Sequence, residues 1–124
     1  MRPPTNNVLL ALGSACRQSV FMPWASQQLQ QLLVGSVTFS RCIWTADVKG
    51  SGTMYLNRLA AGRTALGEEE FTARLKDIER LAGRSPQTVT IDIDLLLFNN
   101  RRHHLADWER DYVTRLIPDI NETL

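Results

Sequence analysis

Two aspartates separated by one residue, Asp92 and Asp94, are the side chains best suited to chemistry in this chain. They lie in residues 88–98, where β-branched and apolar residues predict a strand. Because side chains alternate between strand faces, both carboxylates point the same way, about 7 Å apart at a rise of ~3.3 Å per residue. Their repulsion would be offset by Mg²⁺, which takes one or two carboxylates together with phosphate oxygens and water. The alternative is a solvated sheet face, on which two acids cost little.

Three basic residues near the aspartates could bind the phosphates that accompany such an ion. Arg84 follows a predicted helix, and His104 and Arg110 follow the aspartate strand. Arginine suits this role because its planar guanidinium can donate two parallel hydrogen bonds to phosphate oxygens. Each residue also has a simpler interpretation: Arg84 as a charge at a helix C-terminus, Arg110 on a solvated helix face, and His104 as a surface histidine.

Two tyrosines and an asparagine could bind a flat heterocyclic ring. Tyr55 and Asn57 are two residues apart and share one face of a predicted strand, and Tyr112 lies in a segment that can approach the same face. Aromatic side chains supply stacking area, and a carboxamide recognises donor and acceptor edges. Taken singly, each of the three could instead be core or surface filling.

The elements that must position these residues follow the order β-α-β-β-α-β. Strands are expected over residues 8–12, 36–46, 54–61 and 88–98, long helices over 19–34 and 68–82, and a short helix over 107–116 before a proline. This order predicts one α+β domain over residues 1–124 with a ferredoxin-like fold. Such a fold has an antiparallel sheet with two helices on one face, followed here by a short C-terminal helix.

The composition limits the classes of function. The chain has 124 residues, 44% hydrophobic and 22% charged, as in ordinary globular domains, and its net charge of +1 argues against a nucleic-acid partner. No segment approaches the roughly 18 consecutive apolar residues of a membrane span, and the first residues do not look like a secretory signal. Cys16 and Cys42 are expected to be free thiols. We therefore expect a cytoplasmic protein with no membrane partner.

Four segments resemble the 6-hydroxymethyl-7,8-dihydropterin pyrophosphokinase family of folate biosynthesis, in the family's order and with comparable spacing. They are residues 10–14, 55–57, 78–84 and 90–98, within a resemblance that runs from about residue 8 to about residue 120. The resemblance implies a ferredoxin-like core and an enzyme that transfers pyrophosphate from Mg-ATP to the pterin hydroxymethyl group, releasing AMP. ATP would then be the co-substrate, Mg²⁺ the cofactor and a pterin the acceptor.

The resemblance also implies roles for the metal and phosphate residues. Asp92 and Asp94 match the pair that holds two Mg²⁺ ions. Arg84, His104 and Arg110 match residues that contact the ATP phosphates. Catalysis would thus fall to both aspartates and to Arg110.

On the pterin side, Asn57 matches the asparagine that recognises the ring, and Tyr55 and Tyr112 match the aromatic residues between which the ring stacks. Glu79 matches a helix glutamate of the family with a structural role. The acceptor site is therefore expected on the same sheet face as the aspartates.

The sequence departs from the family pattern around a loop that closes over ATP. Residues 84–91 are several residues shorter than the family's loop, and Val89 stands where the family has an arginine. Phosphoryl-type transfer depends on such cations and on lid closure. Three functions therefore stay open: a minimal pyrophosphokinase, a non-catalytic relative that binds pterin or nucleotide or assists a partner enzyme, and a ferredoxin-like interaction module.

Overall fold

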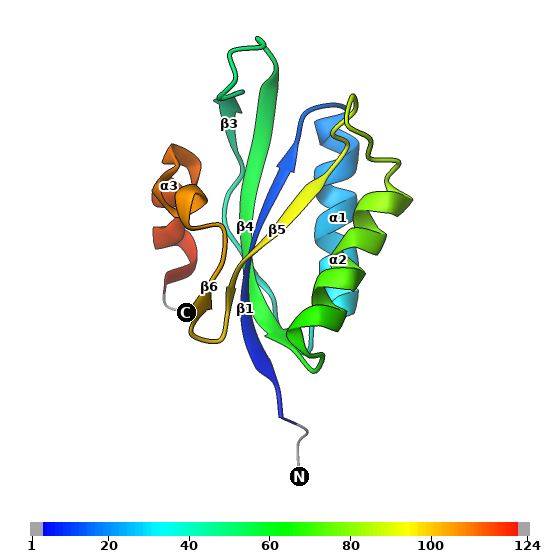
Figure 1. Ribbon diagram of the computed structural model, residues 1–124, viewed down its shortest axis with the longest axis vertical. Helices are drawn as coiled ribbons and strands as arrows, with labels where there is room; N and C mark the ends of the chain where they lie inside the picture. The colour runs from blue at the N-terminus through cyan, green and yellow to red at the C-terminus, as the bar shows by residue number, and fades with distance from the viewer. Residues whose placement is uncertain (1–3, 122–124) are drawn as a thin grey trace.

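The computed structural model describes residues 4–121, and over these residues the chain forms a six-stranded antiparallel sheet with helices against it (Figure 1). In chain order the elements are β1 (Asn6–Ser14), α1 (Gln18–Leu32), β2 (Thr38–Phe39), β3 (Ile43–Ala46), β4 (Met54–Thr64), α2 (Glu68–Leu81), β5 (Asp92–Phe98), β6 (Arg101–Arg102), the 3₁₀ helix η1 (Leu105–Glu109) and α3 (Asp111–Ile120). The strand order is β2-β4-β1-β5-β6, with β3 also paired to β4. The predicted mixed α+β class is confirmed.

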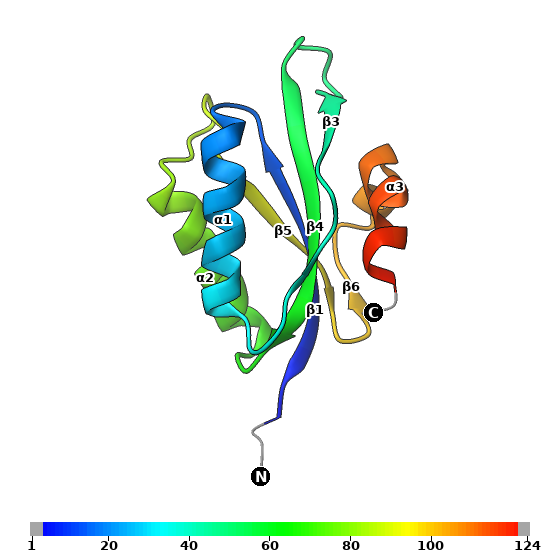
Figure 2. The ribbon, with the colours of Figure 1, turned by 180° about the vertical axis from the view of Figure 1, so that it is seen from behind.

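Apolar side chains on the two faces of the sheet build two separate cores. Figures 1 and 2 show α1 and α2 against one face and α3 against the other. On β1, Leu10 and Leu12 pack in the core with α1 and α2, whereas Leu9 and Ala11 pack in the core with α3. The alternation follows from the two-residue period of a strand. The sheet face that carries the predicted site is therefore partly covered by α3.

Helix α2 matches its sequence prediction closely. It stops at Gly83, whose φ of 75° is a left-handed conformation that glycine adopts without strain. The Gly83 N–H donates to the Arg80 carbonyl (3.0 Å) and the Arg84 N–H to the Glu79 carbonyl (3.2 Å), which is the pattern of a Schellman cap. Its buried apolar stripe is the predicted one: Phe71, Leu75, Ile78 and Ala82.

The strand predicted over residues 36–46 is divided into β2 and β3 by a bulge. Between these two short strands the chain advances four residues where the partner β4 advances three, so one residue is extra. Ser40 stabilises the bulge from both its backbone and its side chain. Its N–H donates to the Leu59 carbonyl (2.9 Å), and its hydroxyl oxygen accepts the Leu59 N–H (2.8 Å). This side-chain bond replaces a ladder bond that a continuous strand would have made.

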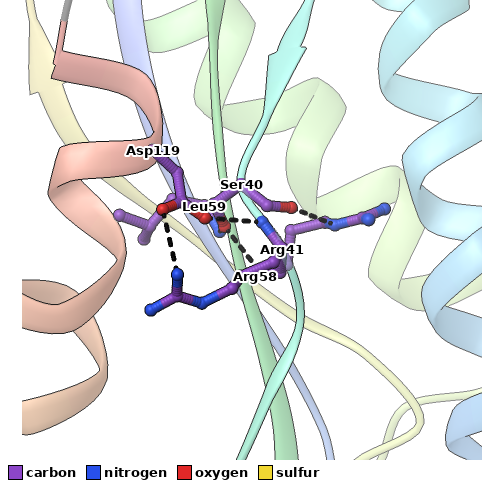
Figure 3. Close-up of polar contacts among 5 residues, drawn as sticks. All are labelled: Ser40, Arg41, Arg58, Leu59 and Asp119. Atoms are coloured by element: carbon purple, nitrogen blue, oxygen red, sulfur yellow. Dashed lines mark hydrogen bonds and ion pairs between the residues drawn. The ribbon is translucent and has the colours of Figure 1, made fainter.

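Helix α3 is attached to the same bulge, as Figure 3 shows. The Asp119 carboxylate accepts the Arg41 N–H (2.9 Å) and lies 3.5 Å from the Arg41 guanidinium. The prediction that the last helix ends before Pro118 is wrong, because α3 continues through Pro118 to Ile120. Burial of Leu116 and Ile120 against the sheet outweighs the backbone hydrogen bond that the proline removes.

The strand predicted over residues 88–98 begins only at Asp92 and carries a bulge of its own. Leu9 of β1 pairs with Leu97 and Leu10 pairs with Leu95, so Leu96 is the additional residue. Leu96 and Leu97 consequently both contact the α3 side, where simple alternation would place one of them.

Two predictions from composition can be compared with the structure directly. Cys16 and Cys42 are free thiols, as expected. Among the described residues, no helix is sufficiently long and apolar to cross a membrane.

Candidate functional site

Strand register places the predicted metal and pterin residues on one face at one end of the sheet. Asp92 pairs with Gly13 on β1, and Gly13 pairs in turn with Asn57 on β4. Residues directly opposite one another share a face, and so do residues two positions apart on one strand. Asp94 and Tyr55 therefore lie on this same face. Gly13 leaves the space between the aspartates and the asparagine open.

A cleft of about 580 Å³ lies over this floor, a volume typical of small-molecule sites. One side is formed by the turn between β3 and β4, and another by the junction of η1 with α3. All of the predicted site residues line the cleft except Arg84 and His104. Those that line it are Asp92, Asp94, Tyr55, Asn57, Arg110 and Tyr112.

The two remaining predicted residues lie close to the cleft without lining it. A guanidinium nitrogen of Arg84 is 3.4 Å from a carboxylate oxygen of Asp92. His104 precedes η1 with a left-handed φ of 51°, and its Nδ1 is 4.0 Å from a carboxylate oxygen of Asp107. Arg84 thus contacts Asp92 of the aspartate pair directly, whereas His104 lies on the η1 side of the cleft.

Asp94 is the aspartate that lacks a cationic partner. It forms no ion pair with any residue from 4 to 121, whereas Asp92 pairs with Arg84. Burial raises the pKa of the Asp94 carboxyl above its usual value, and the negative charge of Asp92 raises this pKa further. Positive charge near Asp94 would therefore stabilise the ionised form of this carboxyl.

Sequence reasoning missed Asp107, which lines the cleft and holds Arg110. The Arg110 Nε donates to an Asp107 carboxylate oxygen at 2.8 Å. Asp107 also lies near Tyr112: burial raises the pKa of the Tyr112 phenol to about 12, and the charge of Asp107 adds to that increase. The spacing of three residues between Asp107 and Arg110 was the available signal, since such pairs are neighbours on a helical segment.

The Asn57 side chain is oriented by bonds within the protein. Its amide nitrogen donates to the Thr45 hydroxyl at 2.7 Å and lies within hydrogen-bond distance of two backbone carbonyls. Within the described residues, its carbonyl oxygen accepts no hydrogen bond, and a Cβ built on Gly13 would lie 3.6 Å from it. The asparagine therefore presents an acceptor to the cleft.

Residues 84–91, the short segment before β5, are fastened to the rest of the chain. Ser85 and Thr88 exchange backbone hydrogen bonds of 3.0 and 3.2 Å. The Val89 carbonyl accepts the Ala15 N–H (2.9 Å), and the Thr90 carbonyl accepts the Ser14 hydroxyl (2.6 Å). This segment is a tight turn bonded to the end of β1, and it does not extend over the cleft, which it does not line.

The donor set limits which metal ion the site can hold. Among residues 4–121, no group of three or more His, Cys, Asp or Glu side chains is arranged to bind a metal ion. Asp92 and Asp94 alone fit Mg²⁺, which takes its other ligands from phosphate and water, and they do not fit zinc, which needs three or four protein ligands.

The cleft is lined by five aspartates, by Lys49 and Arg110, and by two tyrosines, which is a lining typical of sites for charged small molecules that carry a flat ring. The chain belongs to the 7,8-dihydro-6-hydroxymethylpterin-pyrophosphokinase (HPPK) family, whose family model matches residues 9–122. This confirms the resemblance drawn from the four sequence segments, and the matched range includes every residue that lines the cleft. None of the curated proteins matches the chain significantly.

Proposed function

We propose that this chain acts in the cytoplasm as an ATP-dependent pyrophosphokinase on 6-hydroxymethyl-7,8-dihydropterin. The pterin hydroxyl oxygen would bond to the β-phosphorus of ATP and lose its proton to solvent, the bond between that phosphorus and the α-phosphate oxygen would break, and AMP would leave. The supporting observation is that residues predicted for the metal and for the pterin line one cleft in a member of this family. We further propose that the strand order represents a single ferredoxin-like domain.

On the phosphate side, Asp92 and Asp94 would hold Mg²⁺. When bound, the ion supplies positive charge that neutralises the phosphate oxygens. Arg110, held by Asp107, offers N–H donors at the cleft wall, and Arg84 offers a second guanidinium beside the floor. Together these cations orient the triphosphate and stabilise the charge that develops on it, which is the main protein contribution in this type of transfer.

On the acceptor side, Tyr55 and Tyr112 come from β4 and α3 and supply aromatic faces for a flat ring. The unpaired carbonyl oxygen of Asn57 would accept a hydrogen bond from an N–H group of the pterin. Burial raises the pKa of Tyr112 from 10 to about 12, so its hydroxyl stays protonated and neutral even well above physiological pH. A neutral ring next to the acidic floor avoids further repulsion of the phosphates.

The direct test is AMP formation that depends on the pterin, ATP and Mg²⁺. Wild-type protein should release AMP, and the variant Asp92→Asn/Asp94→Asn should lose this activity by several orders of magnitude. Asp77→Asn is a matched control, because Asp77 is a half-exposed aspartate on α2 that pairs with Arg80. Absence of AMP above background with ample wild-type enzyme would exclude the proposed reaction.

One observation favours a second function, in which the chain binds pterin without turnover. Residues 84–91 are bonded to the end of β1 and do not line the cleft, which favours a chain without a lid over the nucleotide. Saturable quenching of Trp44 or Trp108 fluorescence by the pterin, without AMP formation, would support this second function. Pterin binding should then survive Asp92→Asn/Asp94→Asn nearly unchanged.

A further inference from the structure

The C-terminal end of α2 approaches β5 at the aspartate pair. β6 pairs only with Leu97 and Phe98, so within the described chain the first half of β5 has β1 on one side and no strand on the other. The Ile93 N–H, which lies between the two aspartates in sequence, donates instead to a carboxylate oxygen of Glu79 at 2.8 Å. Glu79 is only 5% exposed, so this bond is shielded from water.

The Schellman cap of α2 brings a cation to the same place. The Arg84 N–H donates to the backbone carbonyl of Glu79 (3.2 Å), which fixes the start of the Arg84 side chain one turn from that carboxylate. Its guanidinium then lies 3.4 Å from Asp92. One helix end thus supplies both the acceptor for the strand edge and the positive charge on Asp92.

We propose that Arg84 is the resident counter-cation of the aspartate pair. In the ligand-free protein Arg84 neutralises Asp92; when Mg²⁺ and the nucleotide bind together, the ion replaces it and the guanidinium transfers to the triphosphate. This inference rests on the proposed function, because it concerns the same metal and the same phosphates. The consequence is that Mg²⁺ and the nucleotide bind cooperatively. Mg²⁺ alone breaks the ion pair between Arg84 and Asp92 and leaves the guanidinium without a partner, whereas the Mg-nucleotide complex offers the guanidinium a phosphate to pair with.

The expected size of the effect follows from the exposure of the pair. Both side chains are 36% exposed, so solvent screens their attraction, and pairs of this kind change an equilibrium by up to about fivefold. A charge-assisted hydrogen bond from Arg84 to a phosphate is stronger, and its loss should weaken nucleotide binding by about tenfold or more. The two effects of removing Arg84 therefore have opposite signs.

The experiment is calorimetric titration of the full metal-free chain, first with Mg²⁺ alone and then, at saturating Mg²⁺, with a non-hydrolysable ATP analogue. Arg84→Gln should bind Mg²⁺ about threefold to fivefold more tightly than wild type and the analogue about tenfold more weakly. Arg80→Gln is the matched control: Arg80 lies in the last turn of α2, four residues before Arg84, and pairs with Asp77 at 2.7 Å, so both affinities should stay unchanged.

A structural role for Arg84 would weaken both affinities together, and that result would overturn the inference. Equal Mg²⁺ affinity in wild type and Arg84→Gln, or no measurable Mg²⁺ binding in either, would overturn it too. Arg84→Lys keeps the charge with little risk to the fold and should retain the Mg²⁺ affinity of wild type. The inference can fail while wild-type protein still forms AMP, so its failure is distinguishable from failure of the proposed function.

Discussion

The bond between Glu79 and the Ile93 N–H yields a quantitative prediction for stability. Glu79→Ala removes the acceptor at the free edge of β5 and leaves a buried N–H with no partner. An unsatisfied buried donor costs about 1–3 kcal/mol in free energy of unfolding. The Lys76 ammonium, 3.8 Å from Glu79 and itself mostly exposed, adds little to that loss. Glu79→Gln keeps an acceptor oxygen of nearly the same shape and should lose little.

The effect of pH distinguishes the two variants further. Burial raises the pKa of the Glu79 carboxyl above its ordinary value of 4.5, and the Ile93 N–H only partly opposes this. The folded protein therefore holds this proton more tightly than the unfolded chain does. The associated stability is fully present below about pH 4.5 and is lost as pH rises through the folded-state pKa. Glu79→Gln should accordingly gain stability relative to wild type between pH 4.5 and pH 7.

Urea denaturation at pH 5 and pH 7 measures both effects, and hydrogen exchange of the Ile93 amide reports on the bond itself. Glu70→Ala is the control, because Glu70 lies on the same helix in an exposed pair with Arg74 and should cost less than about 0.5 kcal/mol. If Glu79→Ala were no more destabilising than Glu70→Ala, the carboxylate would not be satisfying the strand edge.

Three further predictions concern the bulge, the cleft and the metal. Ser40→Ala should cost about 1–2 kcal/mol in urea denaturation, because it removes the acceptor for the buried Leu59 N–H; a loss below 0.5 kcal/mol on the same scale would contradict this. In fluorescence titration, Tyr112→Phe should bind pterin within about threefold of wild type and Tyr112→Ala at least tenfold more weakly, because binding depends on the area of the ring and not on ionisation of its hydroxyl. Equal losses of affinity in the two variants would argue against stacking. Without metal, Asp94→Asn should have a higher melting temperature than wild type at pH values above 3.8, because the raised pKa of Asp94 makes its ionisation costly in the folded state. Millimolar Mg²⁺ at pH 7 should make wild type the more stable of the two proteins. No effect of Mg²⁺ on the melting temperature would count against the metal site.

The repeat of side-chain types along single strands and helices determined much of the local structure of this protein, without any tertiary contact. The two-residue period of β5 places Asp92 and Asp94 on one face, and the spacing of Tyr55 and Asn57 does the same on β4. Helix α2 follows from an apolar stripe and a glycine stop, both of which are local signals. These features were predictable because they depend on residues within one turn or one strand.

Only the tertiary structure decided where the strand register shifts and which charged side chains form contacts. The bulge beside Ser40 arises from pairing with β4, and the bulge at Leu96 arises from pairing with β1. No local sequence pattern predicts either bulge. Contact between Arg84 and Asp92 depends on how α2 packs beside β5, and the bond from Ile93 to Glu79 depends on β6 being too short to cover that edge. The sequence thus determined which side chains share a face, whereas packing decided which cation reaches the aspartate pair, because charges far apart in the chain become neighbours only when the helix and the strand are docked.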